Sequence, residues 1–284
     1  MNKEEGYTFY PIHGDIVCFQ NTIHSNSYDL VYHRHNAYEI YLLLIGNPKM
    51  YIEHMCYDLM PKDLLIMRPN EMHRCVCKNN ENLREGIGIN IKGELLERFS
   101  SKRTDLAMCF ESRCAGQNNL VHLSEEQCNH YIMLTNNLRN HINCIAYGSD
   151  LIADSYILQI LVFINKLYQS SSLDVKSIMP KIVSDTMIYI KEHITENITL
   201  DEISKKFNFN GKYISSLFKQ HTGLTIRAYI LDQRIILSKK FLAQGKSVLE
   251  SCYMSGFSDY SNFIRSFTKS VGVSPGRYNK SNKE

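Results

Sequence analysis

Two stretches near the C-terminus carry polar side chains whose types suit contacts with DNA. On a helix expected over residues 210–221, and on another that begins at Ser258 or Asp259, apolar residues recur at core spacing and leave a polar face outward. The outward residues are Lys212, Ser215, Ser216 and Lys219 on the first helix, and Tyr260, Ser261, Asn262, Arg265 and Lys269 on the second. Arg and Asn side chains read base edges, whereas Lys and Ser mostly hold phosphates. A helical bundle with a solvated polar face is the alternative for either stretch taken singly.

The two helices belong to a unit that occurs twice, which favours the DNA interpretation. Each copy opens with a capping box, a pattern in which a Ser or Thr and the Glu three residues later cap the start of a helix. The capping boxes are Thr199 with Glu202 and, 48 residues later, Ser247 with Glu250. Asn208 and Gly256 lie where a turn needs a left-handed backbone. A long helix expected over residues 226–243 would hold the two helix-turn-helix units at a fixed separation.

The charge is distributed unevenly along the 284 residues. Residues 180–284 contain 16 Lys and Arg against 9 Asp and Glu, a net charge of +7, whereas residues 1–179 have 16 against 20, a net charge of −4. A basic C-terminal part is typical of a polyanion-binding module. No apolar run approaches the roughly 18 residues that cross a bilayer, and the first residues do not resemble a secretory signal. We therefore expect a cytoplasmic protein that does not enter a membrane.

The rest of the chain predicts an α+β multidomain protein. Short alternating strands with turn residues between them, over about residues 7–123, favour an antiparallel β-barrel or sandwich. From Ser124 the period becomes helical, which predicts a helix pair, and the region from Pro180 onward is expected to be all-α. We accordingly expect a sensor domain over 1–123, a helix pair and linker over 124–178, and a DNA-binding domain over 179–284.

The C-terminal part resembles the DNA-binding domain of the AraC/XylS family of bacterial transcription regulators. The resemblance covers residues 181–280 and rests on the stretches ITLDEISKKFNFNGKYISSLFKQHTGLTIRAYILDQRI and GFSDYSNFIRSFTKSVGVSPGRYNK. It implies seven helices, two helix-turn-helix units, and insertion of both into successive major-groove segments on one face of the DNA. Ser251 departs from the pattern, because an apolar residue is usual there. Ser215 and Ser216 make the first recognition helix rather neutral, so the second unit or DNA shape is expected to share in specificity.

The N-terminal part resembles the cupin barrels. The stretch His33-x-His35-x3-Glu39-x6-Gly46 matches their first motif, and Pro69-x3-His73 resembles their second. His33, His35, Glu39 and His73 would together suit Fe, Mn, Ni or Zn. The barrels of AraC-type regulators often retain such residues as part of a small-molecule pocket or of a core network instead. Our prediction is therefore a pocket for a small-molecule effector, with a sugar as a candidate class and neither metal nor other cofactor required, lined by His33, His35, Tyr38, Glu39, Tyr41 and His73.

These features together predict a transcription regulator that binds double-stranded DNA in response to an effector, and not an enzyme. The apolar surface of the helix pair over 124–169 is expected to form a homodimer, with packing of this surface on the barrel as the alternative. An activator would also contact RNA polymerase. The alternative is a metal-dependent cupin enzyme fused to a DNA-binding domain. A regulator without a small-molecule effector, acting through protein contacts, is a third interpretation.

Overall fold

The computed structural model describes residues 8–9, 16–24, 32–76, 83–170 and 177–281. The chain divides into two units, which are described separately below. The sheet unit comprises Tyr10–Leu30 and Arg34–Ile178, and the helical unit comprises Met179–Glu284 with the short segments Met1–Phe9 and Val31–His33. The expected linker at 171–176 lies outside the described residues.

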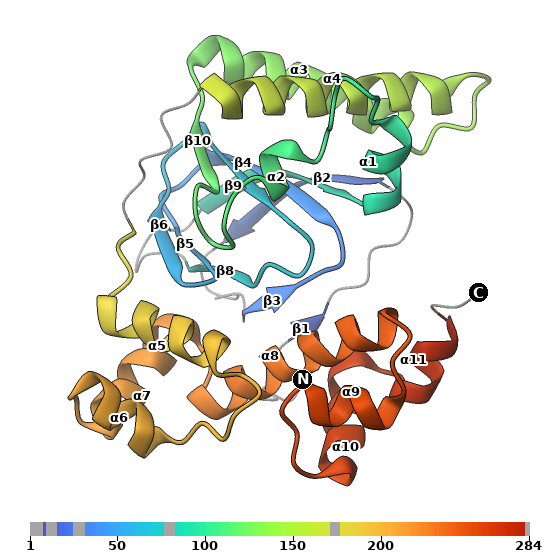
Figure 1. The fold of residues 1–284 in the computed structure, drawn as a ribbon. Helices are drawn as coiled ribbons and strands as arrows, with labels where there is room; N and C mark the ends of the chain where they lie inside the picture. The colour runs from blue at the N-terminus through green and yellow to red at the C-terminus, as the bar shows by residue number, and fades with distance from the viewer. Residues whose placement is uncertain (1–7, 10–15, 25–31, 77–82, 171–176, 282–284) are drawn as a thin grey trace. The chain divides into compact units, whose positions relative to one another are not determined.

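The first sheet of the sheet unit is antiparallel, with its strands in the order β10-β7-β4-β9-β2 (Figure 1). Its strands are β2 (Ile16–His24), β4 (Tyr38–Ile45), β7 (Asp63–Met67), β9 (Leu83–Ile91) and β10 (Leu120–His122). Side chains alternate across the central strand β4. Ile40 and Leu42 pack into one core cluster, whereas Tyr41 and Leu43 pack into another on the opposite face. Neighbouring residues of β4 therefore face different core clusters.

The second sheet has its strands in the order β1-β3-β8-β5-β6. The bounds are β1 (Thr8–Phe9), β3 (His33–Arg34), β5 (Lys49–Ile52), β6 (Met55–Asp58) and β8 (His73–Val76). Strand β5 pairs antiparallel with both β6 and β8. Buried residues of both sheets, such as Tyr41 of β4 and Met50 of β5, share the core between them. The predicted antiparallel architecture is confirmed, but as two sheets and not one closed barrel.

Within the described residues of this unit, four helices accompany the sheets: α1 (Gly93–Phe99), α2 (Met108–Glu111), α3 (Glu125–His141) and α4 (Ser149–Ser170). A capping box of Ser124 and Gln127 starts α3, at the point where the sequence predicted the change to helix. The antiparallel pair α3 and α4 lies side by side over the first sheet (Figure 1). Helix α4 is long and apolar enough to cross a membrane by length and composition. Its Ile157 and Ile164 are nevertheless fully buried in the core cluster that the helices share with the first sheet, as in the core helix of a globular domain.

An ion pair lies in the interior of the sheet unit. Arg113 donates to both carboxylate oxygens of Glu71, at 2.8 and 2.7 Å, and neither side chain is exposed to solvent. Glu71 also accepts hydrogen bonds from the backbone N–H of Gly116 and from Asn119. Burial alone would raise the pKa of Glu71, but the Arg113 guanidinium outweighs burial and lowers it. The pair ties the β7–β8 connection to the segment between α2 and β10.

The helical unit contains seven helices between Lys181 and Ser281, the number that the family resemblance implied. They are α5 (Lys181–Glu192), α6 (Leu200–Phe207), α7 (Gly211–Thr222), α8 (Ile226–Ala243), α9 (Val248–Met254), α10 (Tyr260–Val271) and α11 (Pro275–Ser281). The pairs α6–α7 and α9–α10 form the two predicted helix-turn-helix units. The long helix α8 joins them over the range that the sequence predicted.

Candidate nucleic-acid interface and buried histidine–glutamate cluster

Local signals in the sequence build the first helix-turn-helix unit. The capping box of Thr199 and Glu202 starts α6. Asn208 ends that helix with φ of 55°, in the left-handed region that Asn tolerates. The Asn210 side chain accepts a hydrogen bond from the Lys212 N–H at 2.9 Å and starts α7. The predicted turn and capping box are thus confirmed, and α7 starts where the sequence predicted it.

The second unit repeats this construction with different residues at the turn. The capping box of Ser247 and Glu250 starts α9, and of the two predicted caps it is Asp259, not Ser258, that starts α10. Gly256 occupies the turn with φ of 89°. A Cβ atom at Gly256 would lie 2.6 Å from the carbonyl oxygen of Ile194, so the turn requires glycine for space as well as for conformation.

The two candidate recognition helices, α7 and α10, bury their apolar residues and leave the nominated polar residues outward. Phe218 of α7, and Phe263 and Phe267 of α10, are fully buried. Eight of the nine residues nominated for DNA contact are exposed, and Ser215 is half-buried. The exposed eight are Lys212, Ser216, Lys219, Tyr260, Ser261, Asn262, Arg265 and Lys269. This exposure leaves them available to a duplex, while DNA contact itself stays a prediction.

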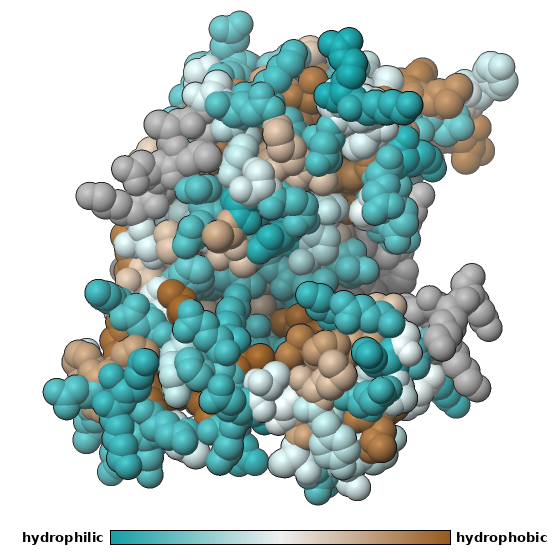
Figure 2. Space-filling view, viewed as in Figure 1, coloured by the Kyte–Doolittle hydropathy of each residue, from teal (hydrophilic) through white to brown (hydrophobic). Residues whose placement is uncertain are grey.

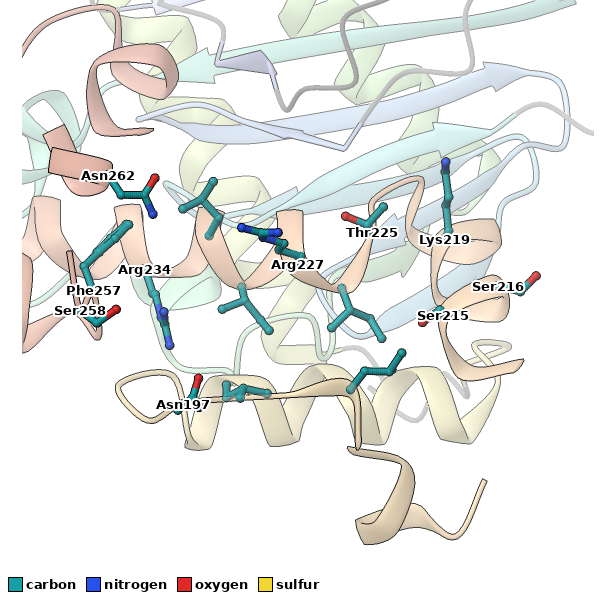
Figure 3. A pocket seen from close by; sticks show the side chains of 15 residues that line it. Asn197, Ser215, Ser216, Lys219, Thr225, Arg227, Arg234, Phe257, Ser258 and Asn262 are labelled. Carbon is teal, nitrogen blue, oxygen red and sulfur yellow. The ribbon is translucent and has the colours of Figure 1, made fainter. Parts of the chain in front are cut away.

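A groove of about 780 Å³ lies beside these helices in the helical unit (Figure 3). Its lining includes four of the nominated residues, namely Ser215, Ser216, Lys219 and Asn262. It also includes Thr225, Arg227 and Arg234, which were not nominated. A signal for the last two was present in the sequence, because positions 227, 231 and 234 fall on one helical face. Arg234 donates to the carbonyl oxygens of Ile194 and Glu196 at 3.0 and 2.6 Å.

In the sheet unit, three of the nominated effector residues form one buried cluster. The Glu39 carboxylate lies 2.6 Å from Nε2 of His35 and 3.2 Å from Nε2 of His73. The two imidazole rings meet edge to face with centroids 5.1 Å apart, and the Glu71 carbonyl lies 2.8 Å from Nδ1 of His73. All three side chains of this cluster, here called the His–Glu cluster, are buried.

The other nominated effector residues are placed differently. Tyr41 is buried on the same face of β4 as Glu39, in the core between the sheets. Tyr38 lies on the opposite face of β4, where its hydroxyl donates to Glu111 at 3.0 Å and its ring packs on Phe110. The structure therefore does not bring Tyr38 into the His–Glu cluster. His33 is half-buried on β3.

The His–Glu cluster supplies the donor types that divalent metals prefer. One ligand atom from each of His35, Glu39 and His73 lies within 4.8 Å of the others, and within the described part of the chain His33 does not join this group. As the side chains stand, the carboxylate lies between two imidazoles, within hydrogen-bonding distance of His35 and 3.2 Å from Nε2 of His73. A metal ligand would instead need each facing nitrogen free of its proton. The cluster can thus bind a polar ligand or a metal only by giving up these contacts.

The cluster predicts a pH-dependent contribution to stability. Burial opposes ionisation, but His35 and His73 hold the pKa of Glu39 well below 4.5, and Glu39 raises the pKa of His73 above 6.5. The Glu39 contribution is lost as pH falls through its folded pKa, and the His73 contribution is lost as pH rises through its own. We expect the loss of unfolding free energy in Glu39→Gln to be greatest between pH 4.5 and 6.5.

Urea unfolding of the wild type and the variant across pH measures this difference. Glu126→Gln is the matched control, because Glu126 is an exposed carboxylate on α3. A Glu39→Gln effect that does not become smaller below pH 4.5 and above pH 6.5 would contradict the assignment of the two shifted groups.

Comparison with known protein families finds a match in each unit. The model of the AraC-like ligand binding domain matches residues 13–161, and a helix-turn-helix domain model matches residues 203–281. HTH-type transcriptional regulator YbfI of Bacillus subtilis is 24% identical over 234 residues, which are 81% of this chain and 80% of that protein. YtdP of the same organism is 36% identical over 100 residues, and the match spans only 13% of its length.

Two further similarities are more limited. The melibiose operon regulatory protein of Escherichia coli is 28% identical over 120 residues, 42% of this chain and 40% of that protein. A crystal structure of apo ToxT from Vibrio cholerae aligns over 94% of this chain and 98% of that one, at 15% identity and a TM-score of 0.39. The ligand-binding model alone covers more than half of the sequence. The chain therefore belongs to the AraC family of transcription regulators, with an AraC-like ligand-binding domain followed by a helix-turn-helix domain.

Proposed function

We propose that this protein regulates transcription by binding specific double-stranded DNA sites through α7 and α10, under the control of a small-molecule effector. The observation that carries the proposal is the pair of capped helix-turn-helix units, each with a polar, exposed recognition helix. The net charge of +7 over residues 180–284 favours a polyanionic partner. Recognition helices in successive major-groove segments on one face of DNA would be about 34 Å apart, one helical turn.

The effector is proposed to bind in the sheet unit at the His–Glu cluster, with a small polyhydroxylated molecule such as a sugar as the first candidate class. His35, Glu39 and His73 offer hydrogen-bond donors and acceptors in a buried setting. Tyr41 adds an aromatic ring with a hydroxyl on the same face of β4. An effector that binds one arrangement of the domains better than another would shift the population able to occupy a DNA site. Tyr38 is omitted from this proposal because it faces away from the cluster.

Homodimerisation through α3 and α4 is proposed as well, which would place two helix-turn-helix domains on two half-sites. The connection between these helices exposes Ile145 and Tyr147 completely, and Leu151 of α4 is also exposed. Figure 2 shows the apolar surface (brown) at the end of the helix pair. Exposed apolar groups gathered in this way suit a protein contact. As a cytoplasmic activator, the dimer would also contact RNA polymerase.

Ligand-dependent thermal stability tests the effector site. Sugars and related metabolites are screened for an increase in the melting temperature of the full chain, because a ligand that binds only the native state stabilises it by about 2.7 kcal/mol at 100 times its Kd. The expected increase is reduced in Tyr41→Phe and retained in Tyr38→Phe. The two variants remove the same hydroxyl from opposite faces of one strand. An equal ligand response in both variants would place the effector elsewhere.

A further inference from the structure

We propose that the groove beside α7, α8 and α10 holds the sugar–phosphate backbone of the DNA between the two recognition helices, with Arg227 as a phosphate-binding residue. The inference rests on the proposed DNA-binding function and deepens it. It assigns a ligand to residues that were not nominated as DNA contacts, and it separates holding the duplex from reading its sequence.

The charge of the groove matches this ligand. Three cationic residues, Lys219, Arg227 and Arg234, line it, and none of its 15 lining residues is acidic. Arg227 is exposed and, among the residues that the structure describes, makes no hydrogen bond or ion pair. Its guanidinium is therefore available to a ligand. Arg234 is fixed by two backbone carbonyls and supplies a permanent positive charge to the same surface.

The position of the groove matches the ligand as well. Figure 3 shows Ser215, Ser216 and Lys219 at one end of the groove and Asn262 at the other, with Arg227 of α8 between them. If α7 and α10 enter successive major-groove segments of one duplex, the minor groove between those segments faces the protein between the two helices. The phosphates that flank this minor groove then lie over α8. The stretch of α8 from Arg227 to Arg234 is about 10 Å long at 1.5 Å per residue. This length corresponds to about three base-pair steps of 3.4 Å.

The apolar part of the lining also suits a nucleic-acid backbone. Ile230 and Leu231 of α8 and Leu200 of α6 form aliphatic surface beside the cations. Deoxyribose presents carbon atoms between successive phosphates, so alternating aliphatic and cationic contacts fit a sugar–phosphate strand. Base edges, by contrast, require hydrogen-bonding groups at fixed positions. The part of the groove along α8 is therefore assigned to backbone contact and not to sequence readout.

The salt dependence of DNA binding tests the assignment. The full-length chain is titrated by fluorescence anisotropy with two duplexes of about 30 base pairs, close to three helical turns. One duplex is selected from a randomised pool on the wild type, and the other has a scrambled sequence. Loss of one phosphate contact lowers the magnitude of the negative slope of log K against log salt by about 0.9. We expect Arg227→Gln to show this decrease and to weaken binding by the same factor on both duplexes.

The control is Lys240→Gln, which removes the same charge from the same helix. Lys240 is exposed and lies 13 residues after Arg227, about 220° around the helix and outside the groove. An unchanged slope in Arg227→Gln, or an equal decrease in both variants, would overturn the groove assignment. A changed ratio between the selected and scrambled duplexes would also overturn it, because Arg227 would then read bases. Failure of the wild type to select any duplex would instead refute the proposed function itself.

Discussion

Arg113→Met is expected to lower the free energy of unfolding of the sheet unit by about 3–5 kcal/mol, because it leaves the Glu71 carboxylate buried without its cation. Both side chains are fully buried and joined by two hydrogen bonds, so neither can turn to water without opening the interior. Two of the remaining partners of Glu71, the N–H of Gly116 and the amide of Asn119, do not neutralise its charge. Urea unfolding of the full chain measures the loss.

Two comparisons make this expectation specific. Arg98→Met removes an exposed arginine whose ion pair with Asp154 lies at the surface, and it is expected to cost at most about 1 kcal/mol. The double variant Glu71→Leu with Arg113→Met should be less destabilised than the sum of its single variants, because no unpaired charge is left inside. Additive losses, or an Arg113→Met effect as small as that of Arg98→Met, would show that the pair is not coupled.

Helix boundaries could be predicted because their signals are local. Thr199 with Glu202, and Asn208 with its left-handed backbone, act within a few residues, and the structure has them as predicted. The side of β4 on which Tyr38 lies could also have been predicted from the sequence. Adjacent strand residues face opposite sides, so Tyr38 and Glu39 could not line one cavity. The sequence motif placed them together, but the alternation of β4 separates them.

Contacts between distant segments left no such signal. Glu71 and Arg113 are 42 residues apart, and their pairing depends on how the β7–β8 connection meets the segment after α2. No periodicity identifies two such partners in irregular segments. The groove in the helical unit could be predicted from the sequence only in part. The spacing of Arg227 and Arg234 marks a helix face, but the turn after α5, whose carbonyls hold Arg234, becomes its neighbour only in the fold.

Arg265→Ala is expected to weaken binding to the selected duplex by about 1–3 kcal/mol and to relax the preference for one base, if its guanidinium reads a base edge. Arg265 is exposed in the first half of α10, the part of a recognition helix that faces the bases. Among the described residues no ion pair or hydrogen bond holds its side chain. No contact with another described residue therefore has to break before Arg265 contacts the duplex. Anisotropy titration on the selected duplex and on its single-base variants measures both effects.

Arg265→Lys separates base reading from phosphate binding. Lysine keeps the charge but cannot reproduce the paired donors with which arginine contacts guanine O6 and N7, so a base reader is not rescued by it, whereas a phosphate contact largely is. Lys205→Ala is the control, because Lys205 is exposed on α6, outside both recognition helices. If Arg265→Ala binds the selected duplex and its variants as the wild type does, Arg265 is removed from the reading set. Specificity would then rest on Asn262, Tyr260 and DNA shape, because the serines of α7 carry little discriminating chemistry.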